Sequence, residues 1–77
     1  MNKVEATVIS EDRRFKVEIE RRSDGALQLV AYKWTEEWIE GYGKLGEFWA
    51  PIRQGITITD TLGRAEQLAH EKLRSLV

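Results

Sequence analysis

The segment TLGRAEQLAHEKLRSLV, residues 61–77, decides the fold, because its apolar residues recur with the period of an α-helix. At 100° per residue, one arc of the helix surface holds Leu62, Ala65, Leu68, Ala69, Leu73 and Leu76. Either Asp60 or Thr61 is expected to cap its start. A helix with one apolar stripe needs a partner surface, which in this chain can only be a sheet formed by the preceding residues.

Alternating apolar and polar residues predict two strands near the start of the chain. Val4, Ala6 and Val8 alternate with polar residues over 3–10, and a second alternation follows over 15–20. The Asp24-Gly25 pair then predicts a hairpin with a two-residue type I′ turn, because both central residues of that turn need a positive φ. This loop fixes the register: the predicted facing pairs are Ile19 with Val30, Val17 with Tyr32, and Phe15 with Trp34.

The segment from 32 to 52 is the richest in aromatic residues, holding six of the seven in the chain. Gly41, Gly43 and Gly46 count against a long helix here. We expect a third strand that runs past Trp34 or bends at 35–37, and then a glycine-rich turn over 41–46. A fourth strand over 47–52 should lie at a sheet edge, and residues 56–58 should form a short extended lead into the helix.

These elements predict one α+β domain over residues 1–77. It consists of a single antiparallel sheet of three to four strands with one C-terminal amphipathic helix packed on one face, in the order β-β-β-β-α. The predicted core is Val4, Val8, Phe15, Val17, Ile19, Val30, Tyr32, Leu62, Leu68, Ala69 and Leu73.

Composition narrows the classes of function. Twelve basic and thirteen acidic residues give a formal charge of −1, which disfavours nucleic acid and anionic membranes as partners. The absence of cysteine excludes disulfides and thiolate metal sites. No stretch approaches the roughly 18 apolar residues of a membrane span, and the start of the chain does not resemble a signal peptide. We therefore expect a cytoplasmic protein with no membrane association.

No motif in the sequence predicts catalysis. His70 is the only histidine, lies outside the apolar arc and has no carboxylate pair at metal-ligand spacing. The glycines over 41–46 lack the spacing of a phosphate-binding loop and are not followed by a helix. We therefore expect no enzyme activity, no cofactor and no metal.

The aromatic residues are the candidate binding site. Three tryptophans exceed what so small a core readily encloses, so Trp38, Tyr42 and Trp49 are predicted to be partly exposed, with Arg53 as a charged residue beside them. The predicted function is a small non-enzymatic protein-interaction module. Its partner would be an unidentified protein or a second copy of the chain. The alternative interpretation is that these rings complete the core.

A resemblance supports a second function. The run GITITDTLGRA, residues 55–65, resembles the start of the helix in HicB-type antitoxin domains, which are small β-β-β-α folds. The resemblance implies a nucleic-acid-binding or antitoxin-like regulator, and the pairs Arg13-Arg14 and Arg21-Arg22 fit that alternative. The chain also resembles small uncharacterised α+β proteins of bacteria, cyanobacteria especially, a likeness that implies no function.

Overall fold

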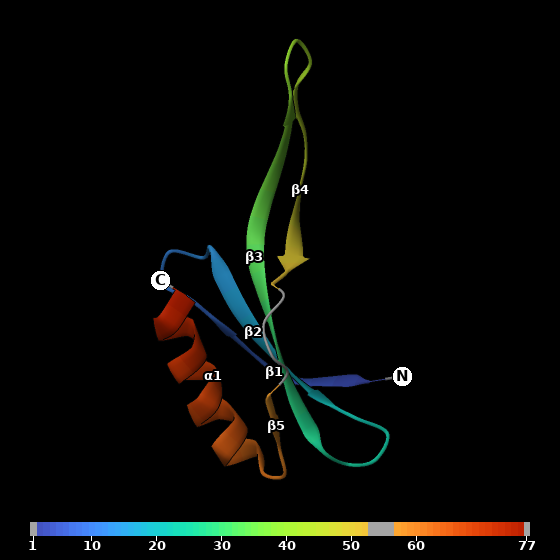
Figure 1. Cartoon of the computed structure of the whole chain (residues 1–77), viewed down its shortest axis with the longest axis vertical. Helices are drawn as coiled ribbons and strands as arrows, with labels where there is room; N and C mark the ends of the chain where they lie inside the picture. Colours follow the sequence, from blue (N-terminus) through green and yellow to red (C-terminus); the bar gives the residue numbers. More distant parts are fainter. Residues whose placement is uncertain (1, 53–56, 77) are drawn as a thin grey trace.

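One antiparallel sheet with a helix on one face forms the protein (Figure 1). The computed structural model describes residues 2–52 and 57–76. Its elements are β1 (Lys3–Ile9), β2 (Phe15–Arg21), β3 (Leu27–Ile39), β4 (Gly43–Pro51), β5 (Thr57–Thr59) and α1 (Leu62–Leu76). The predicted α+β class and the C-terminal helix are confirmed, and the short β5 adds a fifth strand.

The longest strand, β3, is the centre of the sheet. The strand order is β1-β2-β3-β4, and β5 also pairs with β3. Along 27–33 one edge of β3 pairs with β2, so β5 at 27–29 and β4 at 32–39 must share the opposite edge. This arrangement places β4 at the outside of the sheet, as its sequence predicts.

The turn between β2 and β3 differs from the predicted two-residue turn. The Arg22 amide donates to the Ala26 carbonyl at 2.8 Å, and the Gly25 amide donates to the Arg22 carbonyl at 3.0 Å. Three residues, 23–25, therefore lie inside the loop. Gly25 has a φ of 89°, which glycine adopts without strain, and the Ala26 amide also donates to Asp24 Oδ1 at 3.0 Å.

The extra loop residue shifts the register of the hairpin by one. The observed pairs are Phe15 with Lys33, Val17 with Ala31, and Ile19 with Leu29. The predicted pairs Ile19 with Val30, Val17 with Tyr32, and Phe15 with Trp34 are therefore wrong. Because side chains alternate along a strand, a shift of one residue exchanges the two faces of β3.

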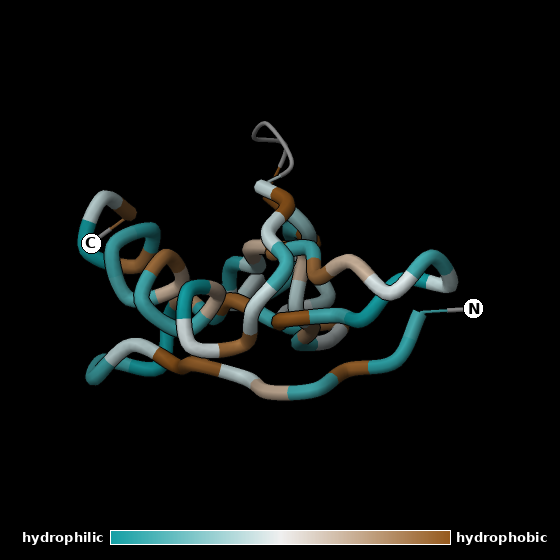
Figure 2. The backbone as a smooth tube through the Cα atoms, turned by 90° about the horizontal axis from the view of Figure 1, so that it is seen from below, coloured by the Kyte–Doolittle hydropathy of each residue, from teal (hydrophilic) through white to brown (hydrophobic). Residues whose placement is uncertain are grey.

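The core lies between the sheet and α1. Its buried residues are Val17, Ile19, Leu27, Leu29, Ala31, Ala65, Ala69 and Leu73. The prediction is correct for Val17, Ile19, Ala69 and Leu73, while Val8, Phe15 and Leu68 are partly buried against this cluster. It is wrong for Val4 and Leu62, which are exposed, and for Val30 and Tyr32, which are half-buried outside the cluster. Figure 2 shows the alternation of apolar and polar residues along β1 from which the strand was predicted.

The helix begins where its sequence predicts. Thr61 Oγ1 accepts a hydrogen bond from the Arg64 amide at 3.4 Å, and the Thr61 carbonyl accepts one from the Ala65 amide at 3.0 Å. Its buried positions recur every four residues at Ala65, Ala69 and Leu73. Two alanines on this stripe leave room for the helix to approach the sheet closely.

Beyond β2, the hairpin of β3 and β4 continues alone as a two-stranded ribbon (Figure 1). We call residues 34–49 the arm. Its turn closes through the Tyr42 amide, which donates to the Ile39 carbonyl at 3.0 Å. The predicted boundaries were wrong here: the turn is shorter than 41–46, and both Gly43 and Gly46 belong to β4. The third strand runs through Trp34 to Ile39, which is the first of the two predicted alternatives.

The register of β2 against β3 can be tested with two neighbouring substitutions. Leu29→Ala should lower the free energy of unfolding by about 2 to 4 kcal/mol, because Leu29 is 2% exposed in the core. Val30→Ala should cost clearly less, since Val30 is only half-buried and lies on the other side of β3. Urea denaturation of both variants measures the difference. A larger loss for Val30→Ala would instead support the register predicted from the sequence.

Candidate functional site

The arm carries most of the exposed large apolar side chains of the described residues. Those on the arm are Trp38, Ile39, Tyr42, Leu45 and Phe48. Trp38 is 63% exposed and Tyr42 is 85% exposed, so neither ring is packed into the fold. Exposed aromatic residues gathered on one segment are typical of protein-binding surfaces.

The exposure of the arm follows from the topology. The longest dimension of the protein is 48 Å, along the direction of the arm, and no helix of the described residues lies beside it (Figure 1). Strand β2 pairs with β3 as far as Lys33, and the Trp34 amide also donates to the Arg14 carbonyl at 2.7 Å, so the residues of β3 after Trp34 pair with β4 alone. A two-stranded ribbon has no second layer to cover either face, and such ribbons are marginally stable alone in water.

Charged residues give the arm an acidic character. The arm has one basic residue, Lys44, and four acidic residues, which gives a net charge of −3 over residues 34–49. The acidic residues are Glu36, Glu37, Glu40 and Glu47. Lys44 forms ion pairs with Glu47 and with Glu36, the latter at 3.6 Å between Nζ and Oε1. Trp38 Nε1 donates to Glu36 Oε2 at 3.2 Å, which fixes the orientation of the indole ring.

At the base of the arm, aromatic rings pack around one lysine on the sheet face opposite the helix. Lys16 Nζ lies 5.1 Å from the centroid of the Tyr32 ring and 4.8 Å from that of the Trp49 ring. Trp49 meets Trp34 edge to face, with centroids 5.2 Å apart and ring planes at 70°. Lys16 also forms an ion pair with Glu18 at 2.9 Å. We call these residues the Lys16 cluster.

Tyr32 is the titratable member of the Lys16 cluster with a shifted pKa. Burial raises the pKa of the Tyr32 hydroxyl above its ordinary value of 10.0, and the negative charges of Glu18 and Glu20 raise it further. The neutral phenol is therefore the form that the folded state favours. This network covers part of the sheet face that α1 leaves open.

The structure divides the predicted site residues into two groups. Trp38 and Tyr42 are exposed on the arm, whereas Trp49 is half-buried in the Lys16 cluster at its base. Arg53 lies outside the described residues. The sequence did not single out Ile39, Leu45 or Phe48, because their exposure depends on the length of β3 beyond β2 and not on their own pattern.

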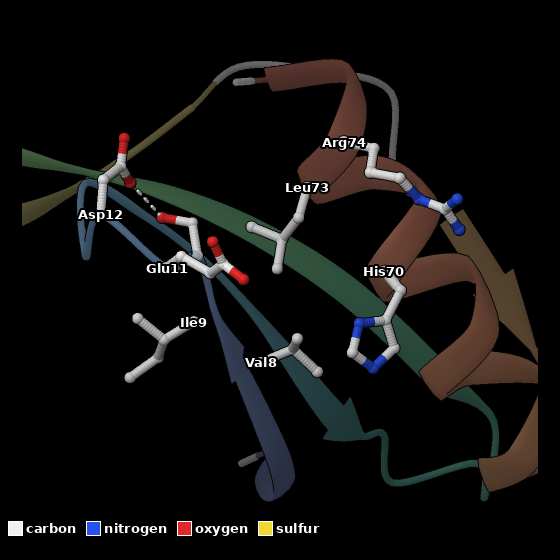
Figure 3. Close-up of a pocket in the computed structure, with 8 residues that line it drawn as sticks. Val8, Ile9, Glu11, Asp12, His70, Leu73 and Arg74 are labelled. Carbon is white, nitrogen blue, oxygen red and sulfur yellow. Dashed lines mark hydrogen bonds between the residues drawn. The ribbon is translucent and has the colours of Figure 1, made fainter.

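A second candidate is an open groove between the end of β1 and α1 (Figure 3). It has a volume of ≈ 800 Å³, with Val8, Ile9 and Leu73 among its apolar residues and His70 and Arg74 on the helix side. Asp12 at one end accepts hydrogen bonds from the Ser10 hydroxyl at 2.6 Å and from the Arg14 amide, and these bonds lower its pKa. Asp12 thus stabilises the loop between β1 and β2 through these two hydrogen bonds.

Among the residues that the structure describes, neither surface gathers a set of metal-ligating side chains. In the part of the chain that the structure describes, no group of three or more histidine, cysteine, aspartate or glutamate residues could hold a metal ion. Arg21 and Arg22 are engaged locally: Arg21 Nε donates to Glu5 Oε1 at 2.7 Å, and Arg22 forms an ion pair with Asp24 at 3.5 Å. Their charges are partly neutralised by these partners.

Comparison with known proteins adds no relative. No protein-family model, curated protein or solved structure matches the chain. The resemblance of residues 55–65 to antitoxin domains therefore stays a prediction. The one described helix is too short and too polar to cross a membrane.

The Lys16 cluster predicts how Tyr32 titrates. In a Tyr42→Phe background Tyr32 is the only tyrosine, and its phenolate absorbance should rise with a midpoint above pH 10.0. Adding Glu18→Gln should lower that midpoint, because it removes a negative charge that opposes the phenolate. A midpoint at or below 10.0 in the folded protein would contradict the packing described here.

The same shift makes a prediction about stability. Because the folded state holds the Tyr32 proton more tightly than the unfolded chain, the stabilising contribution of Tyr32 is complete below the unfolded pKa of about 10. It is lost as the pH rises through the higher folded pKa. Urea denaturation between pH 9 and 11 should show a smaller loss for Tyr32→Phe than for the wild type.

Proposed function

We propose that the protein is a non-enzymatic interaction module that binds another protein chain through the arm. The observation that carries this proposal is the exposure of five large apolar side chains on a ribbon that no other part of the described chain covers. Taking about 150–250 Å² for a whole aromatic side chain, Trp38 and Tyr42 alone present on the order of 300 Å² to solvent. Apolar patches of this size are often functional, which supports an interaction site on the arm.

The two strands of the arm hold each other in a defined conformation, which favours binding. Eight residue pairs connect β3 to β4, and the ion pair of Lys44 with Glu36 joins the two strands on one face, while its ion pair with Glu47 lies within β4. A binding surface that is already ordered loses less conformational entropy on association than a flexible loop would. The carboxylates around the apolar side chains would form the polar rim of the interface and keep the free protein dispersed.

Nucleic acid fits this surface poorly. The arm has a net charge of −3, so phosphate groups would be repelled from the most exposed aromatic residues. The arginine pairs lie outside the arm, and Arg21 and Arg22 form ion pairs there. These charges support a protein partner over the antitoxin-like alternative that the sequence raised.

Site-specific crosslinking tests the proposed function. A photo-reactive amino acid at position 42 should give discrete protein adducts in cell extract, whereas the same group at position 66, on the exposed side of α1, should not. Excess wild type should compete these adducts away, and Trp38→Ser/Leu45→Ser should fail to compete. Both side chains are exposed, so this double variant should keep a melting temperature close to that of the wild type.

The opposite result is equally clear. If Trp38→Ser/Leu45→Ser unfolds the monomer and position 42 yields no adduct, then the arm serves the stability of the fold and the proposed function is wrong. A matched substitution on the helix, Glu66→Ser, controls for general effects on solubility.

A further inference from the structure

We infer that the free edge of β1 binds an extended segment of another protein, which adds to the sheet as a further strand in the groove between β1 and α1. This surface lies at the opposite edge of the sheet from β4, so it does not depend on the function proposed for the arm. The segment that fits it carries an aliphatic side chain and a basic side chain. Three features of the groove support this partner: the free backbone groups of the edge, the apolar floor and the acidic end.

The outer edge of β1 offers unpaired backbone groups. Strand β1 is the first in the order β1-β2-β3-β4, so among the described residues only β2 pairs with it. The Ser10 amide donates to the Phe15 carbonyl at 2.9 Å, which makes these two residues a hydrogen-bonded pair. Hydrogen bonding alternates along an antiparallel strand, so Val8 is the next residue bonded to β2, while Thr7 and Ile9 direct their N–H and C=O groups outward. An added strand binds to groups of this kind.

This part of β1 lacks the features that protect edge strands. Lysines, prolines and bulges suppress the pairing of an edge with other chains. Strand β1 has its lysine and its bulge at the other end, at Lys3 and between Val4 and Ala6. Residues 7–9 are uncharged, contain no proline and pair with β2 in a regular register. An incoming strand therefore meets a regular and uncharged stretch of edge here.

The groove beside this edge has room and an apolar floor for the added strand (Figure 3). Its volume of ≈ 800 Å³ lies within the range of about 300–1,000 Å³ that is typical of binding clefts. Val8 lies on the helix side of β1, opposite the buried Val17, and lines the groove together with Leu73 of α1. A side chain of the added strand that points toward the helix meets these aliphatic groups, so we expect it to be aliphatic.

Unpaired charge at one end of the groove favours a basic residue in the bound segment. Glu11 and Asp12 line this end, and in the described part of the chain Glu11 has no ion-pair partner. Arg74, on the helix side, extends away from Glu11 (Figure 3). Arg13 and Arg14 belong to the same loop but do not line the groove. A lysine or arginine of the bound segment can therefore pair with Glu11.

Peptide selection tests which segment the edge binds. The target is the full chain with Trp38→Ser/Leu45→Ser, which removes two exposed side chains of the arm and so disfavours binding there. Displayed random peptides of about nine residues, a length that strands commonly have, provide the probes. We expect the selected peptides to share an aliphatic residue and, an even number of positions away on the same side of the strand, a lysine or arginine.

Amide exchange locates the selected peptide on the protein. In the free chain the amides of Thr7 and Ile9 should exchange rapidly because they have no partner in the sheet, whereas the Val8 amide is bonded to β2. The peptide should slow the exchange of Thr7 and Ile9 about tenfold or more and should leave Val8 nearly unchanged. NMR spectroscopy measures all three amides in one experiment.

Two substitutions at position 7 test whether the peptide pairs with the backbone. Thr7→Pro removes one outward N–H and leaves the hydrogen bonds to β2 in place, so it should weaken peptide binding about tenfold. Thr7→Val keeps that N–H and should bind as the wild type does. Thr7 is exposed, so both melting temperatures should stay close to that of the wild type. The exchange measurement decides the question if Thr7→Pro proves unstable, because it keeps the native β1.

Charge reversal tests the acidic end of the groove. Glu11→Lys should weaken binding of the selected peptide about tenfold, and a peptide with glutamate in place of its basic residue should bind this variant better than the wild type. Glu66→Lys makes the same charge change on the exposed side of α1 and should have no effect.

The inference is overturned if selection yields no peptide, or if the selected peptide leaves the Thr7 and Ile9 amides unprotected. Equal binding to Thr7→Pro and Thr7→Val, both folded, also overturns it, and unchanged binding to Glu11→Lys overturns the assigned charge. The crosslinks from position 42 report on the arm separately, so neither result decides the other.

Discussion

The three-residue turn between β2 and β3 is the constraint on which the rest of the structure depends. Its closure by the Arg22 and Gly25 amides sets the register, and the register decides which side of β3 faces the helix. With Leu27, Leu29 and Ala31 turned inward, α1 has a continuous aliphatic surface on which to pack. The Asp24 carboxylate accepts a hydrogen bond from the Ala26 amide and so stabilises this longer turn.

The same alternation extends along β3 into the arm, so one local turn also determines what the arm presents. Tyr32 and Trp34, on the side away from the helix, pack with Lys16 and Trp49 into a cluster that partly covers the open face of the sheet. Further along, nothing in the described chain covers Trp38 on one side or Phe48 on the other. The boundary between the fold and the candidate site is therefore the point on β3 beyond which β2 no longer pairs with it.

The sequence predicts the fold class correctly because periodicity is a strong signal for the helix and for the strands up to Ile19. It fails at the turn, since Asp24-Gly25 suits both a two-residue loop and a three-residue loop, and the pattern of residues does not distinguish the two. The predicted face of β3, and with it Val30 and Tyr32 in the core, was wrong for that reason. Of the predicted site residues, Trp38 and Tyr42 lie on the arm, while Trp49 is half-buried at its base.

The edges of the arm help to explain why its faces are the surface available to a partner. Edge strands can pair with other chains through their unpaired backbone groups, and proteins suppress this with bulges, lysines and prolines. Strand β4 has all three: the register shifts at Leu45, Lys44 lies beside it, and Pro51 ends the strand. Pairing through the β4 edge is thus disfavoured, whereas both faces keep their apolar side chains exposed. A partner that approaches the arm from the β4 side is therefore expected to bind through side chains, and their charge and size decide which partner fits.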